Sequence, residues 1–229
     1  MMIKRFYENS NHQLGWRFLN GSKNSLKNPL VALITLNPGG KTIPEGHSWE
    51  SCENGSSYLV EKWKGSAKPG QANLQRQIQL LFEKIIAKGA LSIDRDQLIE
   101  QSLCGYFVPF RSPRLIDLAD KKQTFIFAEH LWGKVLSHVK PRLFVCIDPE
   151  THKRVSSLIS SAYKAPKIST KTFQTNWGKI TATLDRFGTE APVHLLRLPH
   201  LSTFKLFTSD QCQDQLDLIF EEACSVLKN

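Results

Sequence analysis

The tetrapeptide Asn37-Pro38-Gly39-Gly40 combines residue types that suit a ligand-binding turn. Asn37 carries a carboxamide, which can both donate and accept hydrogen bonds, and Pro38 fixes one backbone angle. The two glycines can adopt positive φ, so the turn could present backbone N–H groups beside one oriented amide. Asn-Pro and Gly-Gly also mark ordinary turns, and the tetrapeptide by itself fits a plain turn equally well.

Two further loops carry polar side chains that could meet a ligand. His200 follows an apolar segment, and its neutral ring could donate a hydrogen bond to a developing anion near neutral pH. A histidine in this position can also be a structural hydrogen-bonding residue. Residues 110–114 supply Arg111 and Arg114, which could hold phosphates. We favour a bracing role for Arg111 and a phosphate contact for Arg114.

Short apolar segments come directly before these loops and before Asp148. They are continuously apolar, which is typical of strands buried on both faces: residues 30–36, 103–108, 143–147 and 193–198. Helical periodicity or helix-start residues occupy most of the intervening chain: residues 72–88, 94–101, 122–139, 149–161 and a final helix capped by Ser209. Residues 173–185 resemble a hairpin.

The alternation of strands and helices predicts an α/β fold, a three-layer α/β/α sandwich with a central, mostly parallel four-stranded sheet. Ligands bind such sheets beyond the carboxyl ends of the strands, where Asn37, Arg111, Asp148 and His200 are expected. For Asp148 we prefer the role of an acidic group at a helix N-terminus.

We expect one domain over residues 1–229. It would carry an N-terminal extension, residues 1–28, and a long loop, residues 41–70. A loop of this length in a compact domain is more often functional than idle.

The composition excludes several classes of protein. Of 229 residues, 41% are hydrophobic and 22% charged, which excludes a wholly disordered chain and a collagen-like repeat. The five cysteines form no C-x-x-C pair, so we expect no metal and no cofactor. Cys104 and Cys146 lie in apolar stretches and are expected to be buried thiols in a reducing cytoplasm. No segment approaches the ~18 apolar residues of a membrane span, and the N-terminus lacks the apolar core of a signal peptide.

The charge balance favours an acidic partner. Thirty Lys and Arg residues against 21 Asp and Glu residues leave a net charge of +9. Such an excess suits a nucleic acid or an anionic surface and does not choose between them.

Two of the loops together resemble the uracil-DNA glycosylase superfamily. In its mismatch-directed and single-strand-selective branches, the first strand ends in a Gly-x-Asn-Pro-Gly type motif, and residues 35–39 read Thr-Leu-Asn-Pro-Gly. A second motif, usually His-Pro-Ser-Pro-Leu, follows the last core strand, and residues 200–204 read His-Leu-Ser-Thr-Phe. The resemblance rests on the joint placement of these two short motifs in an α/β pattern that covers nearly the whole chain. It implies a hydrolase that excises a flipped base, uracil or another altered base, from DNA without a metal.

The resemblance implies roles for the residues of the base pocket. Asn37 would position the water that attacks the sugar C1′. His200 would hydrogen-bond the base oxygen on which negative charge builds up. Pro38 and Gly39 would shape the floor of the pocket, and Trp49 would stack on the flipped base.

The resemblance also implies contacts with DNA, single- or double-stranded. Ser202 would contact a phosphate, and Phe204 would take the place of the wedge that fills the vacated stack. Arg111 and Arg114 are the candidate phosphate clamps. The protein would act as a monomer in the cytoplasm, associated with the nucleoid if bacterial, and without a membrane.

Three positions depart from the family's pattern. The base-reading asparagine of the family aligns near Tyr106, which cannot offer the paired donor and acceptor of an amide. Leu201 replaces the proline of the second motif. Asn37 replaces the aspartate of the fastest branch, and an amide cannot act as a general base.

These departures keep other hypotheses open. The alternative to a glycosylase is a non-catalytic nucleic-acid-binding module of the same fold. A third hypothesis is hydrolysis of a small nucleoside or another phosphate-bearing metabolite in the same crevice.

Overall fold

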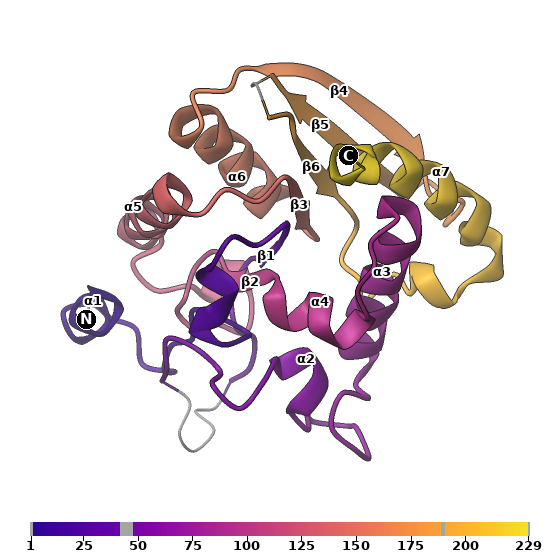
Figure 1. The fold of residues 1–229 in the computed structure, drawn as a ribbon. Helices are drawn as coiled ribbons and strands as arrows, with labels where there is room; N and C mark the ends of the chain where they lie inside the picture. The colour runs from indigo at the N-terminus through magenta and orange to yellow at the C-terminus, as the bar shows by residue number, and fades with distance from the viewer. Residues whose placement is uncertain (1, 42–47, 189–190, 229) are drawn as a thin grey trace.

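A single mixed sheet of six strands runs through the protein, with helices on both of its faces (Figure 1). The structure, a computed structural model, describes residues 2–41, 48–188 and 191–228. The sheet order is β2-β1-β3-β6-β5-β4. The strands are β1 (Val31–Thr35), β2 (Leu103–Tyr106), β3 (Leu143–Cys146), β4 (Lys167–Gln174), β5 (Thr181–Phe187) and β6 (Val193–Arg197). The α/β class is therefore confirmed.

The prediction of a four-stranded sheet was wrong. Strands β2, β1, β3 and β6 are parallel neighbours, but β5 pairs antiparallel with β6, and β4 pairs antiparallel with β5. The predicted hairpin is thus part of the sheet. On β5, Ala182 and Leu184 are buried in the core on one face of the sheet, and Phe187 is buried in the core on the other face. Strand β4 is almost wholly exposed, which is why its polar sequence gives little sign of a strand.

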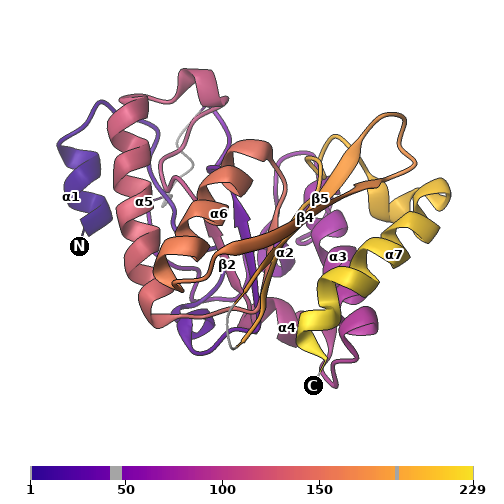
Figure 2. The ribbon, with the colours of Figure 1, turned by 90° about the horizontal axis from the view of Figure 1, so that it is seen from above.

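Alternate residues of the central strands face opposite layers. Leu33 of β1 contacts one core with α3 (Asn73–Gly89), α4 (Arg95–Gln101) and α7 (Gln213–Ala223), whereas Ile34 contacts the other core with α1 (Met2–Glu8), α5 (Lys121–His138) and α6 (Pro149–Ala162). Figure 2 shows these two groups of helices on opposite sides of the sheet. The shorter helices are α2 (Ser57–Val60), η1 (Lys23–Leu26), η2 (Leu115–Asp117), η3 (Leu206–Thr208), η4 (Asp210–Cys212) and η5 (Cys224–Leu227).

The predicted helices are confirmed over α3, α4, α5 and α6. The predicted cap of the last helix is wrong, because two 3₁₀ turns follow Lys205 and α7 begins only at Gln213. Cys104 and Cys146 are fully buried, as expected. Among the described helices, none has the length and apolar character that crossing a bilayer would need.

The N-terminal 28 residues pack into the domain as far as they are described. Trp16, Phe18 and Leu19 are buried. The segment lies beside β2 and is fixed by three isolated bridges, antiparallel between Trp16 and Phe110 and between Leu19 and Gly105, and parallel between Arg17 and Trp49. Part of the predicted 41–70 loop, residues 42–47, lies outside the described residues; the rest is irregular apart from α2.

His12 is a buried histidine in this N-terminal segment, and we expect it to make stability depend on pH. Its Nε2 donates to the Thr124 hydroxyl oxygen at 2.8 Å, because that hydroxyl itself donates to the Ala119 carbonyl. Burial lowers the pKa of His12 to about 4, against an opposing effect of Asp120. In the unfolded chain a histidine has a pKa of about 6.5. As the pH falls, the unfolded chain therefore binds a proton at His12 before the native state does.

The contribution of His12 to the free energy of unfolding should be fully present above pH ~6.5. As the pH falls towards 4, the free energy of unfolding should drop by up to about 3 kcal/mol. Urea unfolding across this range should show a fall in the free energy of unfolding that is absent in His12→Gln. The glutamine side chain can still donate to Thr124. The matched control is His130→Gln, at an exposed position of α5. A pH dependence unchanged in His12→Gln would contradict the assignment.

Candidate active site

The register of the parallel strands brings two predicted site residues, Asn37 and His200, to one edge of the sheet, together with Asp148, for which we prefer a role at a helix N-terminus. Strand β3 lies between β1 and β6, and Ile34, Cys146 and Arg197 form one row across them. Asn37, Asp148 and His200 follow that row by three, two and three residues. With strands ~4.8 Å apart, Ile34 and Arg197 are separated by roughly 10 Å, with Cys146 between them, and the loops that carry Asn37, Asp148 and His200 follow from this row.

The Asn37 amide is oriented by its own two N–H bonds. Its Nδ2 donates to the Pro38 carbonyl and to the Ser112 carbonyl, each at 3.0 Å. Both partners can only accept, so nitrogen must occupy this position of the amide. The Ser112 backbone N–H also donates to the Pro38 carbonyl, at 3.1 Å, which ties the turn to the loop after β2. In the described chain Oδ1 accepts no hydrogen bond, and this atom can serve a ligand.

Arg111 contacts the same turn. Its guanidinium Nη1 donates to the Gly39 carbonyl, and its backbone N–H donates to the Gly15 carbonyl at 3.0 Å. Gly40 has a φ of +110°, and a Cβ there would lie only 2.8 Å from Arg111 Nη1. These contacts fit the bracing role favoured for Arg111.

Arg114 lies further out, with 73% of its side chain exposed, and forms an ion pair with Asp117 at 2.8 Å. Its exposure suits a phosphate contact. A phosphate would compete with Asp117 for the guanidinium group. Arg114 therefore remains the better candidate for a phosphate contact, and the DNA contact of Arg111 stays a prediction beside its bracing role.

The His200 loop forms a tight turn of its own. The His200 carbonyl accepts from the backbone N–H groups of Thr203 and Phe204, at 3.0 and 2.9 Å. The Ser202 hydroxyl lies 2.7 Å from His200 Nδ1, so this predicted phosphate contact touches the imidazole ring. His200 lies at an exposed position, and partial desolvation of its ring lowers the pKa of His200, against the opposing charge of Asp148. The ring is therefore mainly neutral at pH 7.

Two apolar residues anchor this loop. Leu201, at the position of the family's proline, is fully buried in the core. Phe204, the predicted wedge, is half-buried and makes an edge contact with Trp177, with ring centroids 6.3 Å apart. Phe204 would have to leave this contact to enter a base stack.

Tyr106 lies beside a buried carboxamide that the sequence does not reveal. Burial raises the pKa of Tyr106, while Arg17 and a hydrogen bond with Asn20 lower it. Asn20 is fully buried, donates to the Tyr58 hydroxyl at 3.3 Å and accepts from Ser57 at 3.1 Å. The Asn20 amide therefore contacts Tyr106 while it is already hydrogen-bonded to Tyr58 and Ser57.

Trp49 belongs to a polar cluster that the sequence does not predict either. The Arg17 guanidinium carbon lies 4.5 Å from the centre of the Trp49 ring. Arg17 also forms a two-point ion pair with Glu61, in which Nη1 lies 3.1 Å from Oε2 and Nη2 contacts Oε1. Trp63 donates to Glu61 at 2.8 Å, and Arg17 donates to the Cys52 sulfur at 2.9 Å. We call these five residues the Arg17 cluster.

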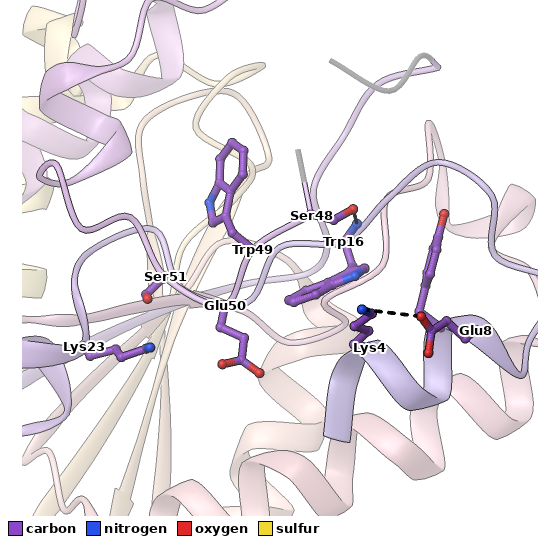
Figure 3. Close-up of a pocket in the computed structure, with 9 residues that line it drawn as sticks. Lys4, Glu8, Trp16, Lys23, Ser48, Trp49, Glu50 and Ser51 are labelled. Atoms are coloured by element: carbon purple, nitrogen blue, oxygen red, sulfur yellow. Dashed lines mark hydrogen bonds and ion pairs between the residues drawn. The ribbon is translucent and has the colours of Figure 1, made fainter. Parts of the chain in front are cut away.

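A pocket of about 580 Å³ shares Trp49 with this cluster and lies between α1 and the segments that carry Trp16 and Trp49 (Figure 3). The Trp49 indole points away from Trp16 in this view. Lys4, Glu8, Lys23 and Glu50 also line it, so its charges are mixed. Neither Asn37 nor His200 lines this pocket.

Metal ligands do not converge among the residues that the structure describes, since no three His, Cys, Asp or Glu side chains are grouped as a metal site requires. No protein-family model matches this chain, and no curated protein sequence matches it.

Proposed function

We propose that the protein is a DNA glycosylase that hydrolyses the N-glycosidic bond of a flipped base, uracil or another altered base. The observation that carries this proposal is the orientation of Asn37. Two backbone carbonyls hold its amide nitrogen, and its oxygen is left to accept a hydrogen bond from a water molecule. A water held in this way can be aligned with the sugar C1′.

The reaction needs two groups on opposite sides of the bond that breaks. The C1′–N bond breaks and its electron pair leaves with the base, while the water oxygen forms the new bond to C1′ and the proton lost by the water ends on the base. His200 donates a hydrogen bond to the base oxygen on which negative charge develops, as a positioned donor does for an oxyanion. Asn37 and His200 are the catalytic residues in this proposal.

The remaining predicted residues would hold DNA. Pro38, Gly39 and Tyr106 would line the base pocket. Trp49 packs against Arg17 and lines a pocket that neither Asn37 nor His200 lines, so it would have to move to stack on the base. The arginines at 111 and 114, with Ser202 and Phe204, would meet the backbone and the vacated stack, and the net charge of +9 would favour the encounter of a monomer with DNA. Tyr106 supplies one hydroxyl where the family has an amide, so the proposal does not assign uracil as the preferred base.

The direct test is incubation with labelled oligonucleotides, single- and double-stranded, that contain uracil, hypoxanthine or mismatched bases. Alkali cleaves the abasic product, and mass spectrometry identifies the released base. Release from at least one substrate is expected. Folded protein that releases no base across the panel would contradict the enzyme proposal.

The same panel separates the other hypotheses. A non-catalytic module would bind the oligonucleotides with an affinity that falls linearly in log salt, and would give no abasic product. A nucleoside hydrolase would release bases from free nucleosides, which mass spectrometry also detects.

A further inference from the structure

The β4–β5 hairpin adds a polar face to the sheet beside β6 (Figure 1). In antiparallel strands, residues directly opposite each other share one face of the sheet. Thr172 of β4 lies opposite Thr183 of β5, and Thr183 lies opposite Arg197 of β6. In the next row Gln174 lies opposite Thr181. We call these five residues the hairpin face.

The hairpin face belongs to the side of the sheet on which α6 packs. In the neighbouring row, Asp185 lies opposite Thr170, accepts from its hydroxyl at 2.6 Å and forms an ion pair with His152 of α6 at 3.2 Å. Ala182, which alternates with the hairpin face along β5, is buried in the opposite core. The two residues that β4 contributes to the hairpin face are exposed, and the other three are half-buried. Helix α6 therefore contacts the Asp185 row and leaves the hairpin face open to solvent.

Arg197 gives the hairpin face its positive charge. Its Nη2 donates to the Thr183 hydroxyl at 2.6 Å, and within the described chain its guanidinium forms no ion pair. Strands β4, β5 and β6 contain one acidic residue, Asp185, which already pairs with Lys167 at 3.4 Å. Lys179, in the turn between β4 and β5, is exposed. The hairpin face thus combines an unneutralised guanidinium with hydroxyl and amide groups, which are the groups that contact phosphate oxygens in protein–DNA complexes.

We propose that the hairpin face binds the phosphodiester backbone of DNA. Arg197 is the last residue of β6, and His200 follows it by three residues. Three residues of chain span at most about 11 Å, and one DNA strand carries a phosphate every ~3.4 Å along the helix axis. A strand whose base reaches His200 can therefore continue over the hairpin face. The choice of DNA as the partner rests on the proposed function, whereas binding by this face does not require catalysis.

The first test is fluorescence anisotropy with labelled single- and double-stranded oligonucleotides that contain no altered base, measured across salt concentrations. Arg197→Gln removes the charge and keeps an amide that can donate to Thr183. We expect weaker binding and a slope of log affinity against log salt that is smaller by about 0.7 on single strands and about 0.9 on duplexes. Arg197→Lys keeps the charge and should keep the wild-type slope. An unchanged affinity and slope in Arg197→Gln would overturn the proposal.

The second test adds a negative charge at an exposed position, so it does not depend on how well Arg197→Gln folds. Thr172→Glu places a carboxylate on the hairpin face and should weaken binding. The matched control is Ser169→Glu, also exposed on β4, because Ser169 lies opposite Arg186 and therefore on the other face of the sheet. The control should bind close to wild type. Equal losses in both variants would overturn the proposal, since net charge alone would then set the affinity.

These measurements separate the hairpin face from the proposed function. If binding depends on Arg197 and Thr172 while the substrate panel gives no abasic product, the proposed enzyme fails and the hairpin face stands. If bases are released but neither variant binds more weakly, the enzyme stands and the hairpin face is overturned. Folded wild-type protein that binds no oligonucleotide at low salt would also overturn the hairpin face.

Discussion

Asn37→Ala is expected to abolish base release while leaving the affinity for DNA nearly unchanged. The variant removes the oxygen that would hold the attacking water, and losing one preorganised group of this kind costs on the order of 10²–10³-fold in rate. The Ser112 N–H still donates to the Pro38 carbonyl, so the turn keeps one of its ties to the loop after β2. Single-turnover excision and fluorescence anisotropy measure the two effects separately.

The matched control is Asn9→Ala. Asn9 is exposed after α1, and its amide also donates to a backbone carbonyl, that of Arg5, at 2.7 Å. The control variant should excise and bind as the wild type does. Excision that survives in Asn37→Ala would remove Asn37 from the mechanism, and an equal loss of DNA binding would show that Asn37 is structural.

The parallel strands could be predicted because the sheet buries them on both faces. Leu33 and Ile34 are adjacent residues that enter opposite cores, and a continuous apolar run is the result. Strand β4 could not be predicted from the same signal. Lys167 and Lys171 lie on its exposed edge, where charged side chains discourage pairing with other chains. Whether the hairpin joins the sheet depends on the pairing of β5 with β6, which is a tertiary contact.

In the candidate site, too, some features could be predicted from the sequence and others depend on tertiary contacts. The strand ends that carry Asn37 and His200 follow from the order of elements, so the sequence could place both at one edge. Asn20 and Arg17 could not be found in this way, because they reach the site through the segment beside β2 and have no motif around them. For Asp148 the predicted helix cap is present, but only the structure shows that its second oxygen is buried without a partner.

The Arg17 cluster leads to the second prediction of large effect. We expect Glu61→Gln to lower the free energy of unfolding by about 3 kcal/mol, because it leaves a buried guanidinium without its counter-ion. Only 3% of the Arg17 side chain is exposed, against 27% for Glu61, so Arg17→Met should cost less than Glu61→Gln. Urea unfolding at pH 7 measures both variants.

The matched control is Arg114→Met, which breaks an ion pair with Asp117 on the surface and should not change stability measurably. The double variant Arg17→Met/Glu61→Gln should cost less than the sum of the two single variants, because no uncompensated charge is then left in the cluster. Additive losses would mean that the two side chains stabilise the protein independently. If Glu61→Gln unfolded at the same urea concentration as Arg114→Met, the buried pair would not hold the Trp49 segment against the N-terminal segment.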